Sequence, residues 1–306
     1  MKIQSSFWFV LSLFLAIGFV SCDDDDPVTP EPETITEIAA ADAQFSTLVS
    51  ALTRTGLDQT LNGGGSFTVF APTNDAFAKL GVDLSTLTDE ALTEILLYHV
   101  LGAEIKAGEI SDGQTYVTTA AETAPGNRAL SMLIEKSASG VAINGNVNVT
   151  ATDIDATNGV IHVVDAVIMP MDVVNHAIAN SNFTSLVGAL SSASGDLVNV
   201  LSGTGPFTVF APLNSAFDEI SSVTATLSND QLRDVLTYHV AAGNVTASEL
   251  TNGDVVTVNG AKFTVTLGTD VILTDEQGNE SKVILTDVQA TNGIIHVIDK
   301  VIIPVL

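Results

Sequence analysis

The strongest constraint on the fold is that the chain repeats itself. The segment FTVFAPTNDAF at residues 67–77 returns as FTVFAPLNSAF at residues 207–217, an offset of 140 residues. ATNGVIHVVDAVIMP at residues 156–170 returns as ATNGIIHVIDKVIIP at residues 290–304, at an offset of 134 residues. Two long motifs in the same order and at nearly the same spacing predict two copies of one domain. At about 135 residues, each copy is long enough to bury a core of its own.

The repeats divide the chain into a signal peptide at residues 1–21, a tether at residues 22–33, a first domain at residues 34–170 and a second domain at residues 171–306. The offset falls from 140 to 134, so the first domain carries an insertion of six residues. Composition favours residues 120–127 for it, because Ala, Thr, Pro and Gly are typical of a surface loop. Few residues separate the two copies, so we expect the domains to pack or hinge closely.

The first 22 residues have the pattern of an export signal. A lysine precedes the apolar run FWFVLSLFLAIGFV, whose fourteen residues are too few to span a hydrocarbon core of roughly 30 Å. The run ends in FVSC, which resembles the lipobox of bacterial lipoproteins, so Cys22 is the predicted lipidation site. The alternative is an ordinary signal peptide followed by a chance cysteine.

The residues after Cys22 predict a tether on the cell surface. Asp23 to Asp26 are followed by a proline-rich stretch, and like charges with prolines keep a chain extended. An acidic run directly after the lipidated cysteine also resembles the surface-export signal of Bacteroidota lipoproteins. This resemblance implies a protein on the outer face of the outer membrane that contacts the membrane through its lipid only.

Composition excludes several classes of partner and chemistry. The chain has 36 acidic and 10 basic residues, a net charge of −26, whereas binding to a phosphate backbone requires Lys and Arg. With one cysteine, no disulfide can form within the chain. The one tryptophan, Trp8, lies in the signal peptide, so we do not expect an aromatic platform for stacking sugars.

Three elements recur in both copies and together carry a family resemblance. They are TVFAPTNDAF, the pair Tyr98-His99, and NGVIHVVDAVIMP, with counterparts in the second copy that include Tyr238-His239. They resemble the signature boxes of fasciclin (FAS1) domains, and the resemblance covers nearly all of the chain after the tether. It implies an α+β fold in which each domain is a wedge-shaped β-sandwich of about seven strands with helices packed on one edge.

Local patterns agree with this architecture. Apolar residues at helical spacing predict helices over residues 46–57 and 184–193. Ser228 and Gln231 have capping-box spacing before another helix. Asn-Gly pairs predict tight turns between strands at residues 158–159 and at their counterpart in the second copy.

Prolines mark the expected strand ends. The two FTVFAP segments read as buried strands that end at Pro72 and Pro212, because proline cannot donate to a ladder. The apolar runs that follow the Asn-Gly turns read as strands buried on both faces and closed by Pro170 and Pro304. Within the NDAF and NSAF segments, Asn74 and Asn214 are expected to cap a helix, with the phenylalanine entering the core.

Four histidines recur in pairs, His99 with His162 and His239 with His296. They could form a metal or haem site or act as general acid and base, but no repeated cysteine or acidic trio accompanies them. Because they lie in apolar runs, we expect neutral imidazoles with a structural role, held by hydrogen bonds. The fifth, His176, has no counterpart and is expected on a connecting helix or its surface.

The family resemblance also marks acidic and aromatic positions that contact partners in some animal fasciclin proteins. Tyr98-His99 and Tyr238-His239 match the Tyr-His pair, and Asp165 and Asp299 match the acids of the second box. We expect these residues to form the fold first and to contact a partner second.

No catalytic, metal or cofactor site is expected. The segment from Asp153 to Gly159 begins like a calcium loop, but its glycine is one place late and the bidentate glutamate is missing. The chain lacks a G-x-S-x-G nucleophile elbow, and Gly63-Gly64-Gly65 precedes a strand, unlike a phosphate-binding loop.

The sequence therefore favours a non-enzymatic protein of the adhesion or extracellular-matrix-binding type. Its partner would be an extracellular protein, a matrix component, a polysaccharide or a second copy of the chain. The alternative is a small-ligand or glycan-binding accessory lipoprotein of a nutrient-uptake system, which predicts a pocket between sheet and helices with convergent polar groups. A hydrolase with a pair of carboxylates in a cleft is disfavoured.

Overall fold

The computed structural model describes residues 33–306, which form one compact unit. The predicted signal peptide, the lipidation site Cys22 and the tether up to residue 32 lie outside the described residues. No helix within residues 33–306 has the length and apolar character needed to cross a membrane.

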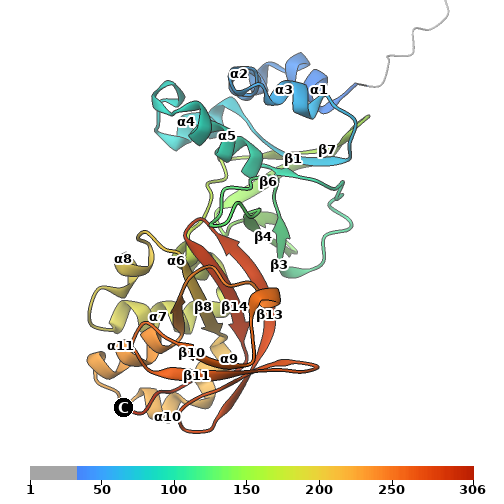
Figure 1. Ribbon diagram of the computed structural model, residues 1–306. Helices are drawn as coiled ribbons and strands as arrows, with labels where there is room; N and C mark the ends of the chain where they lie inside the picture. Colours follow the sequence, from blue (N-terminus) through green and yellow to red (C-terminus); the bar gives the residue numbers. More distant parts are fainter. Residues whose placement is uncertain (1–32) are drawn as a thin grey trace, which may run out of the picture. The chain divides into compact units, whose positions relative to one another are not determined.

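The first domain begins with helices and ends with strands, in the order shown in Figure 1. Its elements are α1 (Ile35–Ala41), η1 (Ala43–Phe45), α2 (Ser46–Thr55), α3 (Leu57–Leu61), β1 (Phe67–Pro72), α4 (Asn74–Leu80), η2 (Leu84–Thr86), α5 (Asp89–Tyr98), β2 (Val100–Leu101), β3 (Gly113–Thr118), β4 (Ser131–Ser137), β5 (Gly140–Ile143), β6 (Val147–Ala156) and β7 (Gly159–Val164).

The second domain repeats this order. Its elements are α6 (Val173–Ala179), η3 (Ser181–Phe183), α7 (Thr184–Ser192), α8 (Leu197–Leu201), β8 (Phe207–Pro212), α9 (Asn214–Glu219), α10 (Ser221–Thr224), α11 (Asn229–Tyr238), β9 (Val240–Ala242), η4 (Ala247–Glu249), β10 (Gly253–Val256), β11 (Lys262–Leu267), β12 (Val271–Thr274), β13 (Glu280–Ala290) and β14 (Gly293–Ile298).

Each domain contains one seven-stranded sheet, and the two sheets have equivalent topologies. The strand order is β2-β1-β7-β6-β5-β4-β3 in the first domain and β9-β8-β14-β13-β12-β11-β10 in the second. Only β1 with β7, and β8 with β14, run parallel. The sheet ends approach each other, because Ala120 N–H donates to the Val100 carbonyl at 2.8 Å and Val258 N–H to Val240 at 2.7 Å. This nearly closed sheet with helices confirms the predicted fold class.

The ends of β1 and β8 confirm the prediction at Pro72 and Pro212. The prediction for β7 and β14 is wrong, because they end at Val164 and Ile298 and not at Pro170 and Pro304. At the aspartate that follows each strand, the N–H still donates to the neighbouring strand, but the carboxylate takes the place of the backbone carbonyl as acceptor. The remaining residues up to the proline therefore leave the sheet.

The Asn-Gly turns connect the sheet to the first helix of each domain. The Asn158 Oδ1 accepts the Ile35 N–H at 3.0 Å, and Asn292 Oδ1 accepts the Val173 N–H at the same distance. Gly159 has φ +145°, and a Cβ there would lie 2.0 Å from the Phe67 carbonyl oxygen. Glycine is therefore required at this close approach of two strands.

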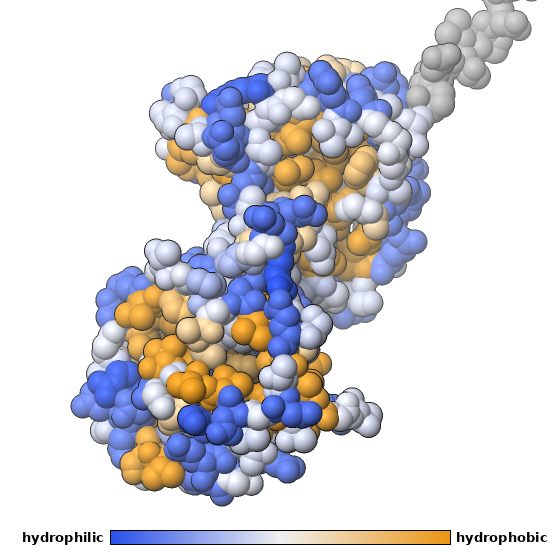
Figure 2. Space-filling view, viewed as in Figure 1, coloured by the Kyte–Doolittle hydropathy of each residue, from blue (hydrophilic) through white to orange (hydrophobic). Residues whose placement is uncertain are grey.

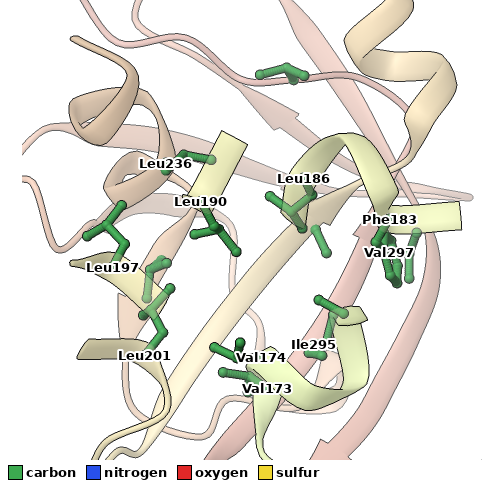
Figure 3. Close-up of a cluster of buried hydrophobic side chains, with 14 of the residues drawn as sticks. Val173, Val174, Phe183, Leu186, Leu190, Leu197, Leu201, Leu236, Ile295 and Val297 are labelled. Atoms are coloured by element: carbon green, nitrogen blue, oxygen red, sulfur yellow. The ribbon is translucent and has the colours of Figure 1, made fainter. Parts of the chain in front are cut away.

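The core of each domain has two parts, one between the helices and the sheet and one enclosed by the curved sheet. Figure 3 shows the helix-side cluster of the second domain, with Val173 and Val174 on α6, Leu190 on α7 and Leu236 on α11 facing Ile295 of β14. A fully buried side chain of this size contributes about 1.5–3 kcal/mol. The predicted capping box at Ser228 and Gln231 is confirmed at the start of α11.

Candidate functional site

The Tyr-His pairs lie at the end of a helix and inside the protein. Tyr98 is the last residue of α5 and His99 its C-cap, and both are almost fully buried, as are their second-domain counterparts. The Tyr98 hydroxyl donates to the Ser131 carbonyl at 2.8 Å and accepts from the Asn144 amide at 3.1 Å. Tyr238 donates to the Lys262 carbonyl in the same way. These side chains cannot reach a partner while the domain is folded.

Both ring nitrogens of His99 and of His239 form hydrogen bonds. Nδ1 of His99 donates to the Ile95 carbonyl at 2.7 Å, and Nε2 accepts the Ile168 N–H at 2.9 Å. His239 makes the equivalent bonds at 2.8 and 3.2 Å. One nitrogen donates and the other accepts, so the imidazole must be neutral. Burial lowers the pKa of each ring to about 4, with the bond to the backbone carbonyl opposing this shift.

His162 and His296 connect the parallel strand to a bulge on the next strand. His162 Nδ1 accepts the Asp153 N–H at 3.2 Å and Nε2 donates to the Ile105 carbonyl at 2.9 Å. His296 bonds to Asp287 and Val245 in the same way. Every ring nitrogen of these four histidines thus has a backbone partner, and residues 33–306 contain no cluster of His, Cys, Asp and Glu able to hold a metal ion.

Asp165 and Asp299 hold the chain where it leaves the sheet. Asp165 accepts from the Asn148 N–H at 2.8 Å and from the Asn148 amide at 3.1 Å. Burial raises the pKa of this carboxyl, but the hydrogen bonds from Asn148 outweigh burial and the pKa is lowered. Asp299 accepts from the Lys282 N–H at 2.7 Å and from the Ser281 hydroxyl.

Asn74 and Asn214 do not cap their own helices, contrary to expectation. The N-cap of α4 is Thr73, and Leu213 at the start of α9 supplies no side-chain cap. The Asn74 Oδ1 instead accepts the Thr47 N–H at 2.9 Å, and Asn214 accepts the Ser185 N–H at the same distance. Each asparagine therefore caps α2 or α7, a helix some thirty residues earlier, which local spacing could not show.

The space between helices and sheet is almost filled. The cavity there is about 20 Å³ in the first domain and about 30 Å³ in the second, with apolar walls and a single histidine each. A cavity of this size holds about one water molecule. It does not provide the convergent polar groups expected for a small-ligand carrier.

The two domains meet through hydrogen bonds that sequence reasoning did not find. The Asn180 amide donates to the Tyr116 hydroxyl at 3.2 Å, and the Gln289 N–H donates to the Ser131 hydroxyl at 2.9 Å. Burial raises the pKa of Tyr116 to about 12, with the Asn180 bond acting against it. We call this contact, with the loop described next, the domain junction.

The predicted insertion forms part of the domain junction. The loop between β3 and β4 spans residues 119–130, whereas its counterpart spans residues 257–261. Within it, Arg128 forms an ion pair with Glu249 at 2.7 Å, and the Pro125 carbonyl accepts from Asn244 at 2.8 Å. The residues that distinguish the first copy in length thus contact the second domain.

His176 lies in the domain junction, which corrects the expectation of a surface position. It is on α6 as a connecting helix would allow, but its side chain is fully buried. Its ring faces Tyr116 with centroids 5.6 Å apart. Its only sequence signal was that it lacked a counterpart.

Exposed apolar residues gather on the second domain. Ten of the twelve large hydrophobic residues exposed within residues 33–306 belong to it, so it is the better candidate for a contact surface. Figure 2 shows hydrophobic residues over this domain in the region where Figure 1 labels β10 and β11.

The outer face of β10 to β13 follows from the strand register. Phe263 and Val265 point into the core, so Lys262 and Thr264 point outward with their cross-strand partners. This outer sheet face carries Val256, Lys262, Thr264, Ile272, Lys282 and Ile284, with ion pairs from Lys262 to Asp254 and from Lys282 to Asp270. By the same register Asp254 and Glu280 also face outward, so exposed apolar side chains are interspersed on this face with threonines and with charged groups.

Comparison with known proteins places these features in a family. The protein-family model described as "Fasciclin domain" matches this chain twice, over residues 43–170 and 181–304. Protein sll1483 of Synechocystis is 40% identical over 139 residues, covering 44% of this chain and 74% of that protein. Cell surface glycolipoprotein MPB83 of Mycobacterium bovis is 34% identical over 127 residues, covering 40% of this chain and only 55% of that protein.

A solved structure supports the fold. A FAS1 domain pair from the insect cell adhesion molecule Fasciclin I matches with a TM-score of 0.52 at 18% identity, covering 86% of this chain and 97% of that one. The match extends over a pair of domains, as the internal repeat predicted.

Proposed function

The chain belongs to the fasciclin-domain family, and on that premise we propose that it is a non-enzymatic, surface-anchored bacterial lipoprotein that binds extracellular protein or matrix. Proteins of this family are of the adhesion type. The observation that carries the proposal is the outer sheet face of the second domain, which offers exposed apolar side chains while the motif residues are buried in both domains.

A protein partner suits this face better than a polysaccharide. Val256 is 58% and Ile284 46% exposed, which favours burial against another apolar surface. The tyrosines of the described residues are buried or half-buried, so they offer no ring for stacking a sugar. Two domains on one tether would also allow a second weak contact to raise the overall affinity.

The experiment uses residues 34–306 coupled to beads and presented to matrix proteins, bacterial envelope proteins and glycans, with and without divalent cations. We expect saturable binding to a protein that is reduced at least tenfold by Val256→Asp with Ile284→Asp. The matched control is Val82→Asp, at an exposed valine of the first domain. Equal loss in the control, or a glycan as the bound class, would contradict the proposed face.

The anchor is tested separately in the full chain. Cys22→Ala should abolish incorporation of labelled fatty acid and release the protein from the membrane fraction, because the thiol is the attachment point. Unchanged labelling would overturn the proposed lipidation. A small molecule that copurifies with residues 34–306, together with no protein binding, would support the accessory lipoprotein of a nutrient-uptake system instead.

A further inference from the structure

His176 is a buried polar side chain without a hydrogen-bond partner. Among the residues that the structure describes, no protein group bonds to Nδ1 or Nε2. The ring is fully buried in the domain junction, beside Tyr116 of β3. Four other histidines of the described chain satisfy both ring nitrogens, so this one needs a separate explanation.

The fold of the domain does not require a histidine here. The position equivalent to His176 on α1 is Ile38, which is half-buried, and the two helices occupy the same place in their domains. An imidazole in place of an aliphatic side chain leaves packing possible but adds a group that takes up a proton near pH 6.5.

No acidic side chain lies where it could balance the positive charge of a protonated His176. The neighbouring helices α7 and α8 and the turn η3 contain no ionisable side chains. Ionisable side chains on the other elements near His176 make no bond to it; they are Asp172 at the N-cap of α6, Tyr116 on β3, Glu135 and Lys136 on β4, Glu280, Lys282 and Asp287 on β13, and His296 on β14.

Most of these groups already have partners elsewhere. Asp172 accepts from the Asn175 N–H, Glu135 from the Gln114 amide, and Asp287 from the Ala247 N–H. A protonated His176 would therefore have no counter-charge, and only the backbone of Gln289 would offset the loss of water around it, which is unfavourable in a buried site.

We propose that His176 makes the domain junction acid-sensitive: the two domains stay docked while its imidazole is neutral, and they separate when it takes up a proton, each domain remaining folded. This goes beyond the proposed adhesive function and does not depend on the identity of a partner. In the separated state the imidazole reaches water, which removes the cost of its charge.

The direction follows from the two states of the ring. Burial lowers the pKa of His176 from 6.5 to about 3 in the docked state, opposed by the backbone of Gln289. The ratio of docked to separated molecules is therefore constant above about pH 6.5 and falls about tenfold for each pH unit below it, until about pH 3. The junction depends on a few hydrogen bonds and one ion pair, so it should yield before the two cores.

The experiment compares residues 33–306, which form one compact unit, with the variant His176→Ile, which copies the first domain. Small-angle X-ray scattering reports separation and far-ultraviolet circular dichroism reports folding, both between about pH 8 and pH 4. We expect the radius of gyration of the wild-type protein to increase below about pH 6 while its dichroism is unchanged. The variant should stay compact over the same range.

Three results would overturn the proposal. They are a wild-type radius that is constant while the protein remains folded, expansion that occurs only together with loss of dichroism, and expansion of His176→Ile at the same pH as the wild type. If the variant does not fold, an NMR titration of the wild-type His176 ring decides the question. A pKa near 6.5 would contradict the proposal, and a value well below it would support the proposal.

Discussion

The two domains share their motifs and differ where they face each other. On the second domain, the junction includes the amide residues Asn180, Asn182, Asn244 and Gln289, the last through its backbone N–H, together with Glu249, which pairs with Arg128. The equivalent residues of the first domain, which do not face another domain, are Asp42, Gln44, Glu104 and Asp155. At three of these four positions the first domain has an acid and the second an amide, which avoids a carboxylate without a counter-charge in the junction.

The two domains also differ at the strand that accepts the tyrosine hydrogen bond, β4 in the first domain and β11 in the second. Ser131 of the first domain lies in the junction, and its carbonyl accepts from Tyr98. The residue whose carbonyl accepts from Tyr238 is Lys262, an exposed side chain paired with Asp254. The second domain therefore presents an exposed lysine at the position where the first domain presents the buried Ser131 of the junction. We infer from this difference that the junction is specific to these two copies.

The largest effect should come from a position where the two domains are alike. Gly159→Ala places a Cβ 2.0 Å from the Phe67 carbonyl, and Gly293→Ala places one 2.2 Å from the Phe207 carbonyl. Each should destabilise its own domain by about 3 kcal/mol or more, measured by chemical denaturation. Gly140→Ala is the control, because it also has positive φ but meets nothing within 4 Å. An equal effect of the control would show that backbone strain, and not the close approach of β1 and β7, is responsible.

The buried histidines should also behave alike in the two domains. His99→Ala and His239→Ala each remove two hydrogen bonds and leave a small cavity, so each should cost about 2–4 kcal/mol and lower the melting temperature by several degrees. Calorimetry measures this change. An unaltered melting temperature together with lost binding would assign the Tyr-His segment to a contact surface and not to the fold.

Acid should weaken the two cores through the same residues. The folded pKa of His99 and of His239 is about 4, below the unfolded value of 6.5. The free energy of unfolding is therefore unaffected by these histidines above about pH 6.5. Below it, the free energy of unfolding falls by about 1.4 kcal/mol per pH unit and per histidine, down to about pH 4. Urea unfolding at several pH values measures the slope. A slope that is absent above pH 4 would contradict the neutral, buried assignment.

Copying the first domain into the junction should separate the domains without unfolding them. Asn180→Asp replaces the amide that donates to Tyr116 with the carboxylate found at Asp42, and it should weaken docking by about 1–3 kcal/mol. Differential scanning calorimetry should then show two transitions that no longer coincide. The reverse change, Asp42→Asn, should leave the profile unaltered, and an equal effect of both would rule out a role for the junction.

The smallest effect is expected from the exposed ion pair of the insertion. Arg128 and Glu249 are 2.7 Å apart, with 30% and 50% of their side chains exposed. Arg128→Ala should therefore lower the free energy of unfolding by only about 0–1 kcal/mol, and this decrease should be smaller at high salt. Denaturation with and without about 0.5 M NaCl measures it. A larger, salt-independent loss would indicate that the loop holds the domains by packing.

Sequence patterns predicted the parts of the fold that depend on neighbours along the chain. The strand ends at Pro72 and Pro212, the hairpin at Asn158-Gly159 and the capping box at Ser228 each follow from local backbone chemistry. Such sequence patterns could not reveal that Asn74 caps a helix some thirty residues earlier. That contact depends on how α2 and α4 pack, which no spacing along the chain specifies.

The junction residues differ between the two copies in a way that is visible in the sequence. Comparing the two copies position by position shows an amide in one where the other has an acid, as at Asn180 and Asp42. The substitution becomes informative only once the structure shows which face is buried. His176 is similar, since its lack of a counterpart marked it but its burial was unexpected.

By itself, the sequence determined that the protein consists of two fasciclin domains of α+β architecture, because a long repeated motif specifies the same turns, strands and caps twice. Only the tertiary structure decided which faces of those domains are covered. It buried the Tyr-His pair of each copy, placed His176 between the domains and left the outer face of β10 to β13 exposed. The physical reason is that burial depends on packing between distant segments, whereas the motif depends on local backbone geometry.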